Sequence, residues 1–390
     1  MQDLIIVAGS VASRYANGGH PWELFSWATG LRRLGFDVCV VDQLFRDRCV
    51  YPEGAEPGYR SCLNVPYART IADGFGFEDS YAIVGDDGGA VLGPSLEDLL
   101  DLAGDSVMLV NLSGTLSLEQ LKQRCRLKVY VDCDPGLTQL WLASGKPAPR
   151  VEGHDVHFTI GENVGTSGCS LPTAGISWLH VRQPVVLDDW PVAEGRARDR
   201  FTTLATLRGP GPHGPLELIG HDPGHKADEF RKVAMLPQLA SATFELAVRM
   251  PVAKGDDVEL LERNGWNVVD AAAVAGDAAT FRGYVQASGA EFSVAKGIFA
   301  ETRCGWFSDR TTRYLASGKP ALVQDTGFAP TIPVGEGLFA FRTLEDAVAA
   351  VEQIADDYDR HSRAARALAA EYFDSDLVLS RFLESIDSRR

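Results

Sequence analysis

Short apolar runs alternate along the chain with segments in which apolar residues recur at helical spacing. The first apolar run is Leu4 to Ala8, and the next is Phe36 to Val41. Between them, residues 21–34 carry apolar residues at helical spacing, open with Pro21 and stop before Gly35, which is typical of a helix. A strand, a helix and a second strand in this order predict a parallel sheet with crossover helices.

The same alternation continues over two stretches of sequence. In the first stretch we expect strands at residues 4–8, 36–41, 107–112, 129–132, 156–160 and 178–181. In the second we expect strands at 201–207, 267–269, 291–294 and 321–324, and helices at 227–236 and 256–264. The tail from residue 344 to 386 is helical in pattern throughout, and there is no internal repeat.

A polar segment with a proline, Asp188 to Pro191, separates the two stretches and leads into a charged run at 194–200. This composition is typical of an interdomain linker. We therefore predict an α/β protein with two Rossmann-like doubly wound domains facing across a cleft. The predicted boundaries are 1–188 for the first domain, 189–200 for the linker, 201–368 for the second domain and 369–390 for a C-terminal helix. Sheets of this kind bind ligands beyond the carboxyl ends of their strands.

Net charge and cysteine content indicate which binding partners and which cellular compartment to expect. There are 53 acidic and 37 basic residues, which gives a formal net charge of −16. Such a charge repels phosphate backbones and anionic membranes, so we expect no nucleic-acid partner. The seven cysteines lack paired metal-site spacing and indicate reduced thiols. The first apolar run is too short for a signal peptide or a transmembrane segment, so we expect a cytoplasmic protein.

The segment from Arg303 to Arg310 is the strongest candidate for a ligand site. Gly305 would let the backbone approach a ligand, and Ser308 could cap a helix whose first N–H groups, at 307–310, face an anion. Two arginines flank the turn, so a diphosphate would suit it. The alternative for this turn is helix capping without a ligand. Separately, Trp306 would either stack on the nucleotide base or fill core.

Two short motifs are shared with a known enzyme family. The matching residues are Gly19, His20, Gly35 and Val38 in the first motif, and Cys304, Gly305, Trp306, Ser308, Gly318, Lys319 and Pro320 in the second. These motifs resemble those of nucleotide-sugar glycosyltransferases of the GT-B fold, most closely the inverting, family 1 type. The likeness of architecture covers the whole chain, whereas the motif matches cover about a tenth of it.

The resemblance implies an activity and its co-substrates. It implies transfer of a sugar from a nucleoside-diphosphate sugar, UDP- or TDP-linked, to a small or medium-sized soluble acceptor. It also implies a C-terminal helix that crosses back to the first domain, and no cofactor or metal, because helix dipoles and basic residues neutralise the leaving group. A homodimer is left open.

His20 is the general base that the resemblance implies, because inverting transfer needs a group to take the acceptor's proton. In the family an aspartate at the end of a later strand orients this histidine, and here that strand ends in Asn111. Asp132 and Asp134, after the next strand, are alternative partners. The other interpretation of His20 is a residue at the start of a helix that bonds only to the backbone.

The donor side of the resemblance carries several departures. Arg303 replaces the family's donor-site histidine, and Gln324 with Asp325 would hold sugar hydroxyls. The ribose-binding glutamate has no exact counterpart, and Asp309 is a carboxylate near its place. Lys226, on the loop 220–226, would be a second phosphate contact. The predicted donor residues are Gly19, Lys226, Arg303, Gly305, Trp306, Phe307, Ser308, Asp309, Arg310, Gln324 and Asp325.

Acceptor contacts are predicted at Trp22, Asp134 and Asn163, each with a structural alternative in core packing or turn formation. Retaining enzymes of this fold carry paired glutamates, and Arg313 occupies the place of the second one, which favours inversion. Three alternatives stay open. They are a nucleotide-sugar 2-epimerase, a retaining glycosyltransferase of the same fold, and a non-catalytic partner subunit that binds a sugar nucleotide.

Overall fold

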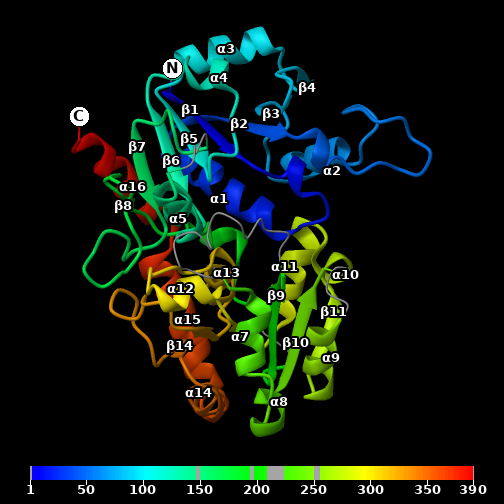
Figure 1. The fold of residues 1–390 in the computed structure, drawn as a ribbon, viewed down its shortest axis with the longest axis vertical. Coiled ribbons are helices and arrows are strands. Elements are labelled where there is room, and N and C mark those ends of the chain that lie inside the picture. Colours follow the sequence, from blue (N-terminus) through cyan, green and yellow to red (C-terminus); the bar gives the residue numbers. More distant parts are fainter. Residues whose placement is uncertain (1, 146–149, 194–196, 209–223, 250–254, 390) are drawn as a thin grey trace.

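Two parallel-sheet domains lie one above the other along the long axis of the molecule (Figure 1). The computed structural model describes residues 2–145, 150–193, 197–208, 224–249 and 255–389. The predicted charged run at 194–200 and the loop at 220–226 lie in part outside these residues. The N-terminal sheet has eight strands and the C-terminal sheet has six, as expected for two doubly wound domains.

The N-terminal sheet has the strand order β4-β3-β2-β1-β5-β6-β7-β8, parallel except for β4 against β3. Its strands are β1 (Leu4–Gly9), β2 (Asp37–Leu44), β3 (Tyr81–Gly85), β4 (Ala90–Leu92), β5 (Met108–Leu112), β6 (Lys128–Asp132), β7 (Val156–Thr159) and β8 (Leu179–His180). Its helices are η1 (Ala12–Arg14), α1 (Gly19–Arg33), η2 (Arg46–Arg48), α2 (Asn64–Gly74), α3 (Leu96–Asp105), α4 (Glu119–Lys122) and α5 (Leu137–Ala143). A short turn, η3 (Leu187–Asp189), leads out of the domain.

The C-terminal sheet has the order β11-β10-β9-β12-β13-β14 and is parallel throughout its described pairs. Its strands are β9 (Arg200–Ala205), β10 (Thr243–Val248), β11 (Asn267–Asp270), β12 (Ala290–Ser293), β13 (Ala321–Gln324) and β14 (Leu338–Phe341). Its helices are α7 (Lys226–Lys232), α8 (Leu236–Leu239), α9 (Asp256–Arg263), α10 (Ala271–Ala275), α11 (Ala278–Ala287), α12 (Gly297–Glu301), α13 (Asp309–Ala316), α14 (Leu344–Asp356) and α15 (Tyr358–Tyr372). The last helix, α16 (Ser375–Asp387), follows.

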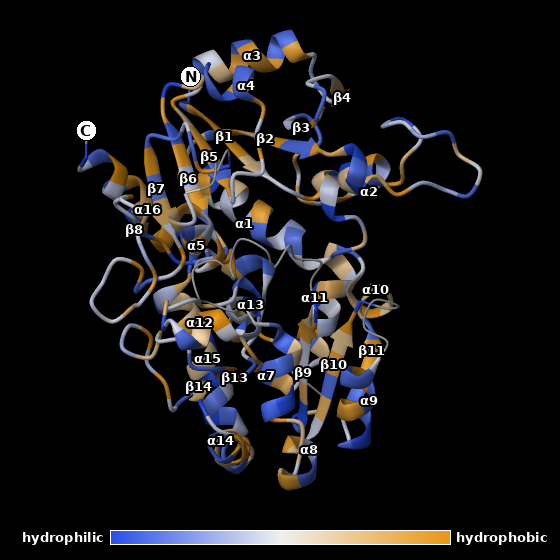
Figure 2. Cartoon of the chain, in the orientation of Figure 1, coloured by the Kyte–Doolittle hydropathy of each residue, from blue (hydrophilic) through white to orange (hydrophobic). Residues whose placement is uncertain are grey.

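The central strands are buried on both faces because helices cover both sides of each sheet. Ile5, Ile6 and Val7 of β1 are fully buried although successive side chains point to opposite faces. Figure 2 shows both sheets as mainly hydrophobic strands. This burial on two faces explains why the strands appear in the sequence as continuous apolar runs.

The chain returns to the N-terminal domain at its end, as predicted for the C-terminal helix. The crossing lies beside the segment that leaves the first domain, where Val185 donates its N–H to the carbonyl of Phe373 at 2.8 Å. Beyond it, α16 packs on α1, with the rings of Phe382 and Trp27 at 5.2 Å between centroids. The two domains are thus joined by two parts of the chain.

The predicted strands are all present, and their ends differ from the prediction by at most three residues. The sequence pattern missed β3, β4, β10 and β14. The helix predicted at 227–236 breaks into α7 and α8, with Pro237 in the first turn of the second helix. Of the helices that the structure describes, none is long and apolar enough to cross a membrane.

Candidate functional site

A polar helix, α13, lies buried between the two domains. All its residues from Arg310 to Ala316 are buried, yet Figure 2 draws most of the helix as hydrophilic. Ser308 caps it as predicted, because its Oγ accepts a hydrogen bond from the N–H of Arg310 at 3.3 Å. Burying charged and hydroxyl side chains costs free energy unless they are paired. Their presence at the contact between the two domains, called the seam below, therefore marks a candidate functional region.

A small cavity opens at the N-terminal end of this helix, beyond the carboxyl ends of β12 and β13. Its volume is about 10 Å³, which is room for about one water molecule. Its walls are Ser293 to Ala295, Trp306 to Ser308, Thr311, Val323, Gln324 and Phe328. The position is the one at which a doubly wound sheet binds ligands, and the predicted donor turn supplies one wall. Trp306 tilts against Phe299 with 4.8 Å between ring centroids.

Lys226 faces this site from the start of α7. Its Nζ lies 5.7 Å from the centroid of the Trp306 ring. Burial, with the positive charges of Arg310 and Lys296, lowers the pKa of Lys226 to about 7, although Glu291 and Asp309 act in the opposite direction. Burial is the main cause of this low pKa, and an anion bound beside the amine would favour its charged form.

Arg310 carries charge here but is bonded within the protein, which differs from the expected phosphate contact. Its Nε donates to Glu291 Oε1 at 2.7 Å and its Nη1 to the carbonyl of Leu204 at 2.8 Å, while Nη2 bonds to Ser293 Oγ. The side chain is buried. The guanidinium therefore contributes its field rather than open donor groups.

Gly305 permits a close approach, but the approach is between the domains. It has a φ of +77°, and a Cβ atom at this position would lie 3.0 Å from the backbone nitrogen of Asn163. Asn163 donates its N–H to the carbonyl of Cys304 at 3.0 Å, and its Nδ2 to the carbonyls of Arg303 and Gly327 at 2.9 Å each. Asn163, predicted to contact the acceptor, thus ties the first domain to the donor turn.

Arg303 keeps an accessible guanidinium beside the turn. Its backbone is left-handed, with a φ of +51°, and its side chain is 41% exposed. Its Nη1 lies 3.5 Å from Asp325 Oδ2, an oxygen that also accepts from Arg342 Nη2 at 2.6 Å. A non-glycine residue in this conformation is uncommon and is found most often where the surroundings enforce it.

The residues predicted to hold sugar hydroxyls already have protein partners. Gln324 accepts from the N–H of Ala295 at 2.9 Å and donates to Glu229 at 2.7 Å. Asp325 accepts from the N–H of Gly327 at 2.8 Å besides its two arginines. A sugar would have to share or displace these bonds.

Three further donor residues predicted from the sequence have other contacts. Phe307 stacks on Phe373 in the core, at 5.0 Å between centroids, so only its backbone is available to a ligand. Asp309 lies 3.3 Å from the guanidinium of Arg313. Gly19 accompanies His20 in the first turn of α1, where its N–H bonds to Asn17 Oδ1 at 3.3 Å.

His20 pairs with a carboxylate that the sequence did not single out. Its Nδ1 lies 3.5 Å from Glu23 Oε2, one helical turn further along α1. Gln183 donates to the other oxygen of Glu23 at 3.1 Å. Burial acts to raise the pKa of Glu23, but its hydrogen bond and charge interaction with His20 outweigh that effect and lower it. Glu23 is therefore ionised beside the imidazole, and the spacing of three residues on one helix was the signal for it.

The partners proposed for His20 in the sequence lie in other networks. Asn111 is buried, donates to the carbonyl of Leu116 at 2.9 Å and contacts His154 Nε2 at 3.0 Å. Asp132 is buried and accepts from Thr138 at 2.7 Å, Gln139 at 2.8 Å and Thr159 at 2.9 Å. Burial raises the pKa of Asp132 despite these bonds. Both hold the ends of their strands.

Two of the predicted acceptor contacts are seam residues as well. Trp22 is 4% exposed, and its Nε1 donates to the carbonyl of Ala278 in the second domain at 2.9 Å. Trp22 is therefore a core residue and does not form the exposed acceptor platform that was predicted. Asp134 accepts from Lys296 Nζ at 2.8 Å through both oxygens, which is an ion pair between the domains.

Arg313, at the place of the second glutamate of retaining enzymes, is fully buried in the seam. It pairs with Asp309, and its Nη2 lies 3.5 Å from Ser26 Oγ of α1. Its Nε is buried and has no hydrogen-bond partner among the described residues. Arg313 thus carries a buried, only partly bonded guanidinium into the contact between the domains.

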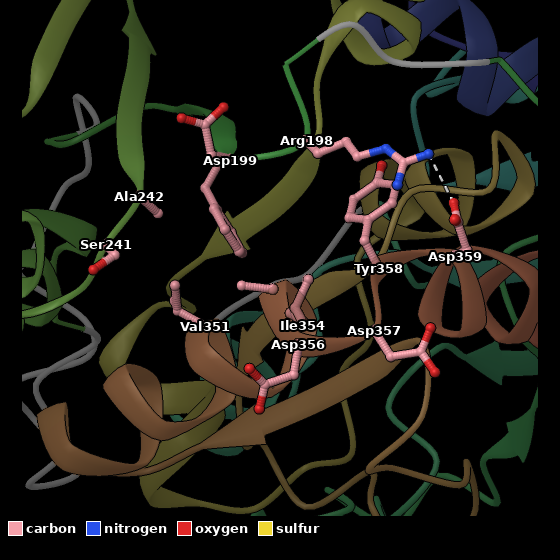
Figure 3. A pocket seen from close by; sticks show the side chains of 12 residues that line it. Arg198, Asp199, Ser241, Ala242, Val351, Ile354, Asp356, Asp357, Tyr358 and Asp359 are labelled. Atoms are coloured by element: carbon pink, nitrogen blue, oxygen red, sulfur yellow. Dashed lines mark ion pairs between the residues drawn. The ribbon is translucent and has the colours of Figure 1, made fainter.

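A larger hollow lies at the other end of the C-terminal sheet (Figure 3). Its volume is about 370 Å³, and it lies between the starts of β9 and β10 and the turn from α14 to α15. Arg198 crosses its edge to Asp359 at 2.8 Å. Because it faces the amino ends of the strands, it is not the ligand-binding edge of a doubly wound sheet.

Comparison with known proteins establishes the architecture. No family model and no curated protein matches the chain. HepE of Anabaena, solved with UDP-glucose, aligns over 100% of both chains at 12% identity and a TM-score of 0.60. An alpha-glucosyltransferase solved with UDP and a mismatched DNA aligns over 99% of this chain and 100% of its own, at 10% identity and a TM-score of 0.58. Sucrose-phosphate synthase of Thermosynechococcus elongatus aligns over 100% of both chains, at 11% identity and a TM-score of 0.54.

These alignments confirm the predicted fold class, since they run over whole chains of the GT-B arrangement. They also correct one expectation. Net charge led us to exclude nucleic acid as a partner, but the alpha-glucosyltransferase of the same fold is solved in complex with DNA. The exclusion is therefore wrong, because net charge averages over the surface and does not describe the cleft.

Proposed function

We propose that the protein is a glycosyltransferase that takes its sugar from a nucleoside-diphosphate donor, with UDP as the nucleotide. The observation that carries the proposal is the position of Lys226, whose Nζ lies 5.7 Å from the Trp306 ring beside the Ser308-capped end of α13. A diphosphate placed between Lys226, Lys296 and Arg303 would supply the missing negative charge. Proteins of this fold solved with UDP or UDP-glucose support the choice of nucleotide.

The groups around α1 suggest a general base for the transfer. We infer that His20 takes the proton of the acceptor hydroxyl and that Glu23, 3.5 Å away, stabilises the imidazolium that forms. Arg313 supports inversion, because a retaining arrangement based on a carboxylate at that position has no carboxylate to use. The cations of the site are expected to neutralise the leaving diphosphate, so that no metal is required.

The acceptor is expected to be small or medium-sized, as the family resemblance implies, and DNA belongs in any panel of acceptors. A non-catalytic binding subunit and a 2-epimerase remain the competing functions. Both would bind the nucleotide, but neither would move a sugar to a second molecule.

The first test is a thermal-shift screen with UDP, GDP, TDP, ADP and CMP. A ligand at a hundredfold excess over its dissociation constant stabilises the folded state by about 2.7 kcal/mol. We expect UDP to stabilise the wild type, and we expect the stabilisation to be smaller in Arg303→Ala. Arg342→Ala is the control, because it removes the other arginine that pairs with Asp325, and it should keep the full stabilisation. No stabilisation by any nucleotide would refute the donor site.

The second test is turnover. With UDP-sugar and an acceptor panel, His20→Ala should lose transfer by about a hundredfold or more while UDP binding persists. Full turnover by His20→Ala would remove its role as the base. Binding without turnover under every condition would favour the non-catalytic subunit.

A further inference from the structure

Three arginines meet at the carboxyl edge of the N-terminal sheet, outside the donor site. Arg14 ends η1, just after β1, and Arg48 ends η2, just after β2. Arg150 packs its backbone on Gly114 after β5, where a Cβ atom on the glycine would lie 2.2 Å from the carbonyl oxygen of Arg150. Strands β2, β1 and β5 are neighbours, so the three turns share one edge of the sheet.

A buried carboxamide holds two of these turns together. Asn64 Nδ2 donates to the carbonyl of Ala12 at 2.7 Å and to that of Arg48 at 3.1 Å, and its Oδ1 accepts from the N–H of Val50 at 2.7 Å. Asp42 fixes the same region, since its Oδ2 accepts from the N–H of Ala12 at 2.6 Å. The arginines therefore project from turns whose backbones are set, which suits a preformed site.

The positive charge at this edge is not neutralised by its own ion pairs. Among the described residues, Arg14 and Arg150 form no salt bridge, and that of Arg48 is a 3.5 Å contact with the adjacent, exposed Asp47. Burial and the charges of Arg48 and Arg150 lower the pKa of Arg14, against the effects of Glu23 and Asp134. Both of those carboxylates already serve other partners, His20 and Lys296.

We propose that Arg14, Arg48 and Arg150 bind a phosphate group of the acceptor. The planar guanidinium fork matches phosphate oxygens in two-point hydrogen bonds, and three such groups can offset the double charge of a phosphate monoester. Calling the bound molecule the acceptor rests on the proposed function. The position supports it, because Arg14 lies at the same carboxyl edge of the sheet and interacts electrostatically with Glu23, the partner of His20.

Two sources supply this chemistry, a small phosphorylated molecule or the phosphodiester chain of a nucleic acid. The test separates them from each other and from the donor site. The protein is first saturated with UDP, which fills the donor site, and is then titrated by calorimetry with glycerol 3-phosphate and with a short single-stranded DNA. The variants are Arg14→Gln and Arg48→Gln, and Arg126→Gln is the matched control, an exposed arginine just before β6 at the opposite edge of the sheet.

We expect each of the two variants to bind the phosphate probe about tenfold more weakly, since a charge-assisted hydrogen bond is lost, while the control binds as the wild type does. A loss seen with glycerol 3-phosphate alone assigns a small phosphorylated acceptor, and a loss that includes the DNA assigns a phosphodiester. Binding of neither probe, or equal binding by all variants, would overturn the subsite. UDP affinity is measured in each variant, so failure of the donor site is seen separately.

Discussion

Lys226 gives the sharpest test of the donor site, because its ionisation ties nucleotide binding to pH. Its pKa is lowered to about 7, chiefly by burial and then by Arg310 and Lys296. A bound diphosphate favours the charged amine, so binding above pH 7 must take up a proton from solution. The affinity for UDP should therefore fall as the pH rises, while the unbound amine is increasingly neutral.

The size of the effect follows from the fraction of charged lysine. With a pKa of about 7, about nine-tenths of the unbound protein carries the charge at pH 6 and about one-tenth at pH 8. The dissociation constant for UDP should rise about tenfold over that range and about tenfold again by pH 9. At pH 8, binding should take up about 0.9 proton, which calorimetry in buffers of different ionisation enthalpy measures directly.

Variants isolate the lysine from the ionisation of UDP itself. Lys226→Arg keeps a charge that does not titrate in this range, so its affinity should lose the fall above pH 7. Lys226→Met should bind weakly at every pH, whereas Lys232→Met, an exposed lysine on the same helix, should behave as the wild type does. An identical pH dependence in wild type and Lys226→Arg would refute the reasoning, because some other group would then be responsible.

Further predictions concern the base, the core and the seam. Glu23→Gln should lower kcat and shift the pH profile of transfer with little change in KM for the donor, whereas an unchanged profile would contradict its pairing with His20. Burial raises the pKa of Asp42 to about 6, above its unfolded value, so the stability that this group contributes is present at pH 4 and lost by pH 7. That loss is about 3 kcal/mol in urea unfolding and should be absent in Asp42→Asn. Asp134→Asn should release Lys296 and tighten UDP binding about threefold, and a weaker affinity would contradict the competition. Gly305→Ala should destabilise the fold by about 1–3 kcal/mol in the same assay, because its φ is +77° and the Asn163 backbone leaves no room; an unchanged midpoint would contradict this.

The architecture could be predicted because a strand that is buried on both faces has a continuous run of apolar residues in the sequence. Residues 4–8 and 36–41 needed no tertiary information to be identified as neighbouring parallel strands. The turn before α13 could be predicted for a local reason too, since Ser308 caps the helix that follows it. β10 was missed because its charged and small residues, in the sequence Thr-Phe-Glu-Leu-Ala-Val, weaken the pattern of a strand that tertiary packing buries.

The roles of single side chains were harder to predict than the turn that carries them. Arg310 and Gln324 face the expected region, but Glu291 and Glu229, distant in sequence, take up their hydrogen-bonding groups. Gly305 has the backbone freedom that was inferred, used for contact with Asn163. The hydrogen-bond partners of these side chains depend on which segments lie together in space. A single sequence does not reveal those contacts before the fold is known.

The distribution of charge could not be predicted from the sequence either. A formal net charge of −16 is an average over the whole chain, and it suggested a protein that repels phosphate. The fold brings cations from distant segments together: Arg14 interacts with Arg48 at the edge of the N-terminal sheet, and Lys226 interacts with Lys296 and Arg310 at the start of α13. Field lines concentrate in a cleft with low-dielectric walls, so these few charges decide what enters it. Net charge alone therefore does not predict whether such a cluster of cations attracts a phosphate.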